Sequence, residues 1–174
     1  MILNYFAFGS NLSSRRLLQR LPQARVHCVA TLSHHRLCWR KNDQGQSGKC
    51  DIEQTSDPDH LVYGVVYQMT VEEQLELDKY ESAGYGYERK EVEVLNLEGE
   101  PIPTFTYYAL DILDGQPPFH WYKEHVLRGA IEHDFPQHYI ETIRATVSKD
   151  DHDSDRIARE VVLYEDLSPI ALND

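Results

Sequence analysis

The chain has few cysteines, and they are far apart. It contains three in 174 residues, Cys28, Cys38 and Cys50, with no Cys-x-x-Cys pair. An odd number at these spacings argues against a disulfide framework and against a zinc-finger type of site. We expect reduced thiols that pack as small apolar side chains. Cys50 stands beside a glycine-rich stretch, so an exposed nucleophile is the weaker alternative for that residue.

Long apolar runs and excess positive charge are also missing. No run approaches the roughly 20 residues that span a bilayer, and no basic segment opens the chain as in a signal peptide, so we expect a cytoplasmic protein outside the membrane. Lys and Arg number 17 against 29 Asp and Glu, a net charge of −12. This charge repels phosphate backbones and argues against a nucleic-acid partner. The length and the 41% of apolar residues predict one globular domain over 1–174; they carry no signal for the oligomeric state.

Nine histidines are present, but their spacing does not predict a metal site. His34 and His35 are adjacent, so they face opposite sides of a strand. His120 and His125 are five residues apart, which is not the i, i+4 pair of a zinc-binding helix. We therefore expect surface histidines, no metal and no other cofactor.

The hydrophobic pattern predicts strands in the first two thirds of the chain and helices in the last third. A capping box is expected at Thr70 and Glu73, with Leu75 and Leu77 pointing inward, and Lys41 to Gly48 is expected to be a loop. The predicted strands cover residues 2–8, 24–39 (two strands bent near Ser33-His34-His35), 50–53, 61–69, 87–97 and 102–110. The predicted helices cover residues 12–21, 70–80, 119–133 and 136–147; the segment 148–174 has no clear assignment. This order indicates an α+β fold.

The first twelve residues carry the most informative pattern. An apolar strand, Ile2 to Phe8, meets Gly9-Ser10-Asn11 and then an amphipathic helix. Free backbone N–H groups at such a turn favour an anion or a developing oxyanion. Without context, a capped turn that binds no ligand is the more frequent outcome.

Four segments, in this order, together resemble the γ-glutamylcyclotransferase family, in its general, AIG2-like branch. Residues Tyr5–Leu12 resemble its N-terminal aromatic-Gly-Ser-Asn signature, with Phe8 where tyrosine is more frequent. The others are Tyr63–Met69, Leu77–Glu81 (Leu-Asp-x-x-Glu, with Ser82 where glycine is frequent) and Pro117–Tyr122 running into Leu127–Ile131. The resemblance covers about residues 3–145, and it is the ordered set that makes it specific.

The resemblance implies a small mixed β-barrel with flanking helices and a cavity at one end. It also implies the release of an amine from a small-molecule γ-glutamyl substrate, with formation of 5-oxoproline. The α-amine of the substrate attacks its own γ-carbonyl, and one carboxylate serves as base and then as acid. Glu81 matches that carboxylate.

The remaining site residues follow from the same resemblance. Phe8, Gly9, Ser10 and Asn11 are expected to bind the carboxylate or the oxyanion of the substrate through backbone N–H groups. Tyr122 is expected to donate its hydroxyl to the substrate. Tyr87, or alternatively Tyr85, is expected to line the same pocket.

Three alternatives stand beside this interpretation. A related member of the fold could act on another small amide or amine, which the replacements at Phe8 and Ser82 keep in view. A non-catalytic module that only binds a small molecule is less favoured, because Gly9-Ser10-Asn11 and Glu81 are all present. A glutathione-specific enzyme is also less favoured, because the Leu-Asp-x-x-Glu spacing resembles the general branch.

Overall fold

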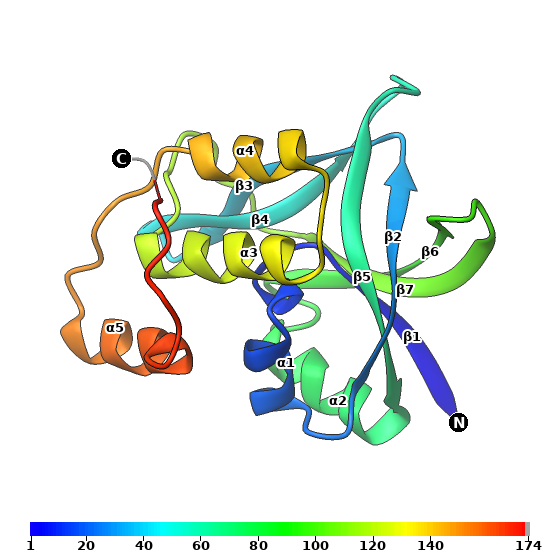
Figure 1. The fold of residues 1–174 in the computed structure, drawn as a ribbon, viewed down its shortest axis with the longest axis horizontal. Coiled ribbons are helices and arrows are strands. Elements are labelled where there is room, and N and C mark those ends of the chain that lie inside the picture. Colours follow the sequence, from blue (N-terminus) through cyan, green and yellow to red (C-terminus); the bar gives the residue numbers. More distant parts are fainter. Residues whose placement is uncertain (173–174) are drawn as a thin grey trace.

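Five strands close into a barrel in the computed structural model, which describes residues 1–172 (Figure 1). Around the barrel the strands follow the order β1-β5-β2-β6-β7. Neighbours are antiparallel except β1 and β7, which pair in parallel at Tyr5 and Phe105. The bounds are β1 Ile2–Ala7, β2 Arg25–Ser33, β5 Leu61–Thr70, β6 Tyr87–Asn96 and β7 Pro101–Ala109. The expected α+β class with a mixed barrel is confirmed.

Strand β5 has an almost continuous apolar run because both of its faces are covered. Val62, Val65 and Val66 have no exposed surface. On the face toward the helices, the ring of Tyr63 lies 5.8 Å from that of Phe135 and 5.0 Å from that of Tyr139. The strand therefore joins the barrel interior to the helical layer.

A separate two-stranded sheet corrects one of the expectations. The segment 41–48 is not a loop: β3 runs over His35–Asp43 and β4 over Ser47–Gln54, and the two pair in an antiparallel hairpin. Only Gln44 to Gln46 form the turn, with Gln44 and Gly45 at positive φ. Lys49 Nζ lies 3.0 Å from Asp43 Oδ1 across the hairpin. The polar residues belong to strands that lie outside the barrel.

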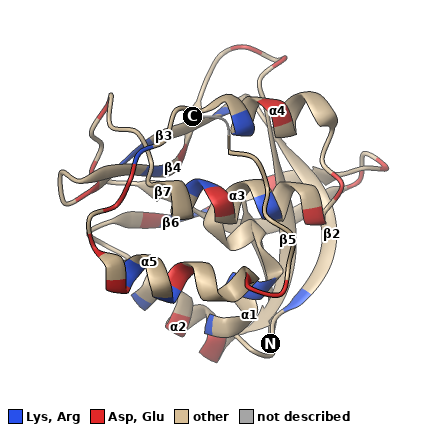
Figure 2. Cartoon of the chain, turned by 60° about the vertical axis from the view of Figure 1, so that its left-hand side comes forward, with Lys and Arg blue, Asp and Glu red and all other residues tan. Residues whose placement is uncertain are grey.

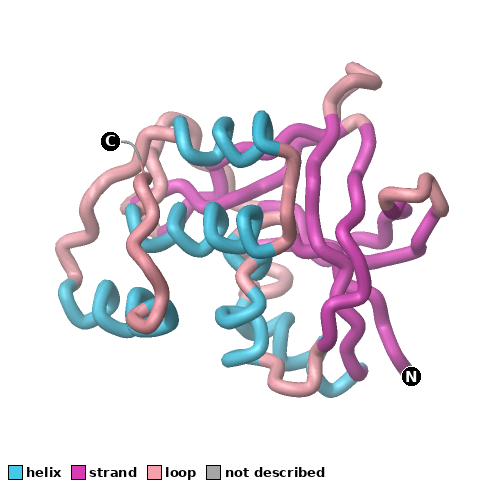
Figure 3. The backbone as a smooth tube through the Cα atoms, in the orientation of Figure 1, coloured by secondary structure: helices cyan, strands magenta, loops and turns pink. Residues whose placement is uncertain are grey.

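The helices lie on one side and at one end of the barrel, as the helix and strand colours in Figure 3 show. A short 3-10 turn η1 spans Ser10–Leu12 and precedes α1, Ser14–Arg20. The others are α2 Val71–Tyr80, α3 His120–Glu132, α4 Gln137–Ala145, α5 Ser154–Val161 and the 3-10 turn η2 Val162–Tyr164. The capping box at Thr70 and Glu73 is confirmed. Leu77 is buried as expected, but Leu75 is 56% exposed, so its inward orientation was wrong.

Helix α3 approaches the η1 turn closely because residue 129 is a glycine. A Cβ at Gly129 would lie 2.4 Å from Leu12 Cβ and 2.5 Å from the backbone nitrogen of Ser13. A larger residue would therefore force the helix and the turn apart. Tyr67 of β5 holds the same turn from the barrel side, donating its hydroxyl to the carbonyl of Leu12 at 3.0 Å.

A buried polar cluster ties the C-terminal segment to α1 and α3. The Nε2 atom of His125 lies 2.9 Å from Arg16 Nη1 and 2.8 Å from Glu160 Oε2. Tyr164 lies 2.7 Å from His125 Nδ1 and donates to Ser13 Oγ at 2.8 Å. Burial lowers the pKa of His125 to about 4. Burial alone would raise the pKa of Glu160, but the hydrogen bond to His125 and the charge of Arg16 outweigh it and lower that pKa to about 2.

The expectation that the histidines lie on the surface was wrong for two of them. His125 of this cluster is fully buried, and His35 of β3 is 7% exposed. Elsewhere acidic and basic positions are interspersed, for example along α3 and α5 (Figure 2). None of the helices described within residues 1–172 is long and apolar enough to cross a membrane.

Candidate active site

Glu81 is placed by the end of helix α2. Its backbone N–H closes the last turn on the carbonyl of Leu77. The chain then turns sharply, with Ser82 at φ 51° and Gly84 at φ 89°. Ser82 thus occupies a left-handed conformation that glycine adopts with less strain. The Glu81 side chain is only 15% exposed, and its carboxylate faces Asn11 of the η1 turn.

Asn11 meets Glu81 through its side chain. Its Nδ2 donates to Glu81 Oε1 at 2.9 Å and to the hydroxyl of Tyr5 at 3.2 Å. Its Oδ1 accepts from Arg20 Nη1 at 3.0 Å. The expectation for Asn11 concerned its backbone N–H alone, so the contact with the carboxylate is an addition from the structure.

A cavity of about 30 Å³ lies between the η1 turn, the end of α2 and strands of the barrel. The structure brings all seven predicted site residues to its wall: Phe8, Gly9, Ser10, Asn11, Glu81, Tyr87 and Tyr122. Of the two alternatives, Tyr87 lines the cavity, whereas Tyr85 is 86% exposed.

Gly9 is required by the tight packing beneath the turn. A Cβ at this position would lie 2.9 Å from Cys50 Cβ and 3.4 Å from the Tyr122 hydroxyl. Without a side chain, the main chain of the turn reaches the wall made by β4 and α3. Gly9, Ser10 and Asn11 all line the cavity.

Two tyrosine hydroxyls hold the backbone of Cys50 between them. The N–H of Cys50 donates to the Tyr122 hydroxyl at 3.1 Å, and the Tyr87 hydroxyl donates to the carbonyl of Cys50 at 2.8 Å. Burial raises the pKa of both tyrosines well above the ordinary value. Both hydroxyls therefore stay protonated; the Tyr87 proton is bonded to the Cys50 carbonyl, and the Tyr122 hydroxyl also interacts with the Cys50 thiol.

Cys50 itself does not fit the alternative of an exposed nucleophile. The residue is 1% exposed, and burial raises the pKa of its thiol far above the usual range. A thiol that stays protonated is a poor nucleophile. Cys28 and Cys38, expected to be buried, are partly exposed.

The sequence did not identify four residues around the cavity. Tyr5, Tyr107 and Cys50 line it, and Arg20 lies behind Asn11. Tyr107 donates to Asp78 Oδ1 at 2.6 Å, and Asp78 stands one turn before Glu81. Asp78 and Glu81 are three residues apart at the end of one helix, and this spacing could have predicted that their side chains lie on the same face. The tyrosines come from barrel strands far away in the sequence and had no such signal.

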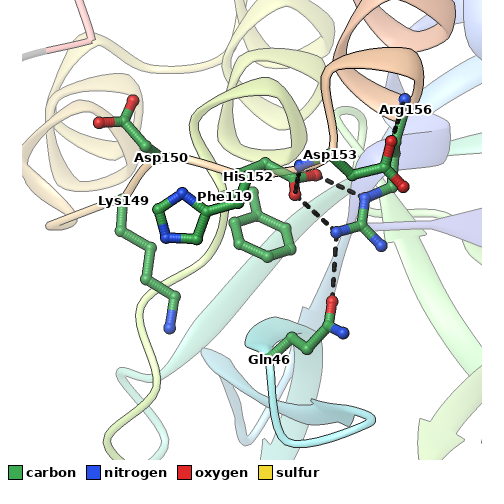
Figure 4. Close-up of a pocket in the computed structure, with 8 residues that line it drawn as sticks. Gln46, Phe119, Lys149, Asp150, His152, Asp153 and Arg156 are labelled. Atoms are coloured by element: carbon green, nitrogen blue, oxygen red, sulfur yellow. Dashed lines mark hydrogen bonds and ion pairs between the residues drawn. The ribbon is translucent and has the colours of Figure 1, made fainter.

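A larger cavity lies elsewhere and does not have the same chemistry. Its volume is about 510 Å³, and its wall includes Phe119, Lys149 and Arg156 (Figure 4). Arg156 is already paired with Asp151, with Nη2 to Oδ1 at 2.6 Å, and it also contacts Gln46. Lys149 Nζ is bonded to Gln116 Oε1 at 3.0 Å. Both Arg156 and Lys149 are thus already bonded to other side chains of the protein. Within residues 1–172, no three His, Cys, Asp or Glu side chains are grouped as a metal site.

Comparison with known proteins relates this site to a defined family. The model of the AIG2-like family matches residues 61–143. The chain is 35% identical to a human protein named gamma-glutamylcyclotransferase over 153 residues, which is 84% of this chain and 79% of that protein. It is 33% identical to the mouse protein of the same name over 147 residues, 81% of this chain and 77% of that one.

The solved structures agree with the sequence comparison. A structure described as gamma-glutamyl cyclotransferase superposes with a TM-score of 0.79 at 29% identity, covering 92% of this chain and 99% of that chain. A human protein described as uncharacterized superposes with a TM-score of 0.78 at 31% identity, covering 91% and 98%. The similarity therefore spans the barrel, the helical layer and the cavity.

Proposed function

Because the chain belongs to the γ-glutamylcyclotransferase family, we propose that it converts a γ-glutamyl amide or γ-glutamyl amino acid into 5-oxoproline and a free amine. The observation that carries the proposal is the Glu81 carboxylate, which accepts from Asn11 Nδ2 at 2.9 Å in the wall of the cavity. No cofactor is required, since the nucleophile and the electrophile belong to the same substrate.

The first step is ring closure. The α-nitrogen of the substrate forms a bond to its γ-carbonyl carbon, and Glu81 accepts the proton that this nitrogen loses. Asn11 occupies Oε1 of Glu81, and within residues 1–172 no donor contacts Oε2, so we assign the proton to Oε2. Tethering supplies a large part of the acceleration, because well-oriented intramolecular reactions reach effective molarities on the order of 10⁵ M or more.

The second step is the loss of the amine. The carbonyl oxygen has carried negative charge since ring closure, when the electron pair of its π bond moved onto it, and we assign the stabilisation of this charge to the N–H groups at Gly9, Ser10 and Asn11 together with the Tyr122 hydroxyl. The oxygen now returns this electron pair to restore the carbonyl. The bond from carbon to the leaving nitrogen breaks, and Glu81 returns its proton to that nitrogen. This regenerates the Glu81 carboxylate, so the enzyme neither gains nor loses a proton over the reaction. Phe8 and Tyr87 are assigned to the wall that keeps water out.

The test is 5-oxoproline release by the purified protein from a panel of γ-glutamyl amino acids, γ-glutamyl amines and glutathione. We expect turnover with at least one substrate and its loss in Glu81→Gln, with the fold retained by circular dichroism. Glu88→Gln is the matched control, because Glu88 is an exposed glutamate on the neighbouring strand. Turnover in Glu81→Gln at the wild-type rate would remove Glu81 from the mechanism. Failure of every substrate would redirect the proposal to another amide or to binding alone.

We further propose a cytoplasmic location and a part in the turnover of γ-glutamyl peptides, with residues 1–174 acting as one domain. None of the three cysteines, all among the described residues, forms a disulfide, which fits a reducing compartment. Cell fractionation with an antibody against the chain tests it.

A further inference from the structure

Arg20 lies directly behind the catalytic candidate, at the end of helix α1. Its side chain is 17% exposed, and its Nη1 is 3.9 Å from Glu81 Oε1 and 3.0 Å from Asn11 Oδ1. The guanidinium also stacks over the ring of Tyr80, 4.8 Å from its centroid. Within residues 1–172, Glu81 is the only carboxylate within 4.0 Å of it. The guanidinium thus packs on one aromatic ring and faces one amide and one carboxylate.

The contact with Arg20 decides which way the Asn11 amide points. An amide has an acceptor end and a donor end of nearly the same shape. A guanidinium only donates, so the oxygen of Asn11 must face Arg20, and the NH₂ group must face Glu81 and Tyr5. The reversed amide would place NH₂ against the cation and oxygen against the carboxylate. Both contacts would then be repulsive.

We infer that Arg20 is a positioning residue for the cyclisation, which fixes the Asn11 amide so that Asn11 holds one carboxylate oxygen of Glu81 and leaves the other for the substrate. The inference rests on the proposed function.

Few other charges face Glu81, so the effect of Arg20 is separable. The titratable side chains that interact with the Glu81 charge are Tyr5 of β1, Tyr87 of β6, Tyr107 of β7, Tyr122 of α3 and Lys41 of β3. Burial raises the pKa of all four tyrosines, so they are neutral near pH 7. Lys41 is not within 4.0 Å of any carboxylate among the described residues, and its ammonium lies over the Tyr87 ring at 5.5 Å. Arg20 is therefore the nearest cation to the carboxylate.

The test compares Arg20→Met, Arg20→Lys and the control Arg15→Met, which removes an arginine of the same helix that pairs with Asp166 on the surface. In Arg20→Met we expect kcat for 5-oxoproline release to fall at least tenfold, with KM within threefold of wild type. Arg20→Lys keeps the charge without the planar fork, so kcat remains low. Arg15→Met changes neither kcat nor KM.

A double variant tests whether Arg20 acts through Asn11. The double variant Asn11→Ala/Arg20→Met is expected to lose no more kcat than the more impaired of the two single variants, because both substitutions remove the same chain of contacts. Additive losses would show that Arg20 acts independently of the amide and would overturn the inference. Wild-type kcat in a folded Arg20→Met protein would overturn it as well.

A measurement without turnover separates this inference from the proposed function. Nitrogen-15 NMR of the Asn11 side-chain amide follows its contacts directly. We expect the Asn11 amide resonances to shift in Arg20→Met and to stay in Arg15→Met, because only Arg20 of these two arginines donates to Asn11 Oδ1. Shifted amide resonances without 5-oxoproline release from any substrate would refute the reaction and support the role of Arg20. If Arg20→Met does not fold, Arg20→Lys carries the test, and a wild-type kcat in that variant would refute the need for the fork.

Discussion

Mild acid is expected to destabilise the fold through the buried imidazole of His125. Burial lowers its pKa to about 4, whereas a histidine in an unfolded chain titrates near about 6.5. Between these values the unfolded chain binds a proton that the folded protein does not bind, so the free energy of unfolding falls as the pH falls. From about pH 7.5 to about pH 5 the two titrations give a loss of about 2 kcal/mol.

The perturbation is His125→Gln, which keeps polar atoms near Arg16 and Glu160 but removes the titrating ring. The assay is urea unfolding followed by tryptophan fluorescence, since Trp121 lies in the core beside His125, with ring centroids 5.9 Å apart. The variant is expected to be less stable than wild type near pH 7.5. Its further loss on acidification is expected to be about 2 kcal/mol smaller than that of wild type.

The control is His27→Gln, because His27 is exposed and its removal leaves the wild-type loss unchanged. Equal losses in wild type and His125→Gln would refute the reasoning, and so would an NMR titration of the His125 ring with a midpoint near 6.5. Glu160 acts in a lower window. Because its folded pKa is depressed to about 2, its contribution is complete above about pH 4.5 and is lost as the pH falls toward 2.

Two further substitutions test the packing around the cavity. Gly129→Ala is expected to lower the free energy of unfolding by about 1–3 kcal/mol and to reduce kcat, because the new Cβ meets Leu12 at 2.4 Å; urea unfolding and the turnover assay measure both effects, and an unchanged protein would mean that the helix and turn separate easily. Tyr122→Phe is expected to leave the N–H of Cys50 without its acceptor, at a cost of about 1–3 kcal/mol in stability, and to lower kcat/KM at least tenfold. Loss of stability with an unchanged kcat/KM would show that Tyr122 supports the backbone and does not contact the substrate.

Local patterns were sufficient to predict most elements of this fold. Strand β5 and helix α2 have strong local signals, a buried apolar run and a capping box, and both lie within a residue or two of their predicted bounds. The strands predicted after the bend at residues 33–35 and at 50–53 are parts of β3 and β4, but the ends of these strands next to their turn were missed, because Lys41, Asn42 and Asp43 are polar and are typical of a loop. Their strand pairing depends on β4, which supplies the partner residues Ser47, Gly48 and Lys49.

The site was predictable as far as its residues lie in motifs. The segment that contains Gly9, Ser10 and Asn11 and the one that contains Glu81 were both recognised, and the structure brings them to one cavity. The role of the Asn11 side chain was not predictable, because its partners Arg20 and Tyr5 become neighbours only when α1 and β1 are folded. The burial of His125 was missed for the same reason, since Glu160 and Tyr164 reach it from the last twenty residues.

The close contact at Gly129 has a consequence for the order of events in a catalytic cycle. One wall of the cavity, the η1 turn, is packed tightly between α3 and β5. Another part of the wall contains Glu81 and Tyr87, which are joined by residues 82–86; residues 82–85 face solvent, and Ser82 and Gly84 have positive φ. We expect an entering substrate to displace this second side while the tightly packed turn stays in place.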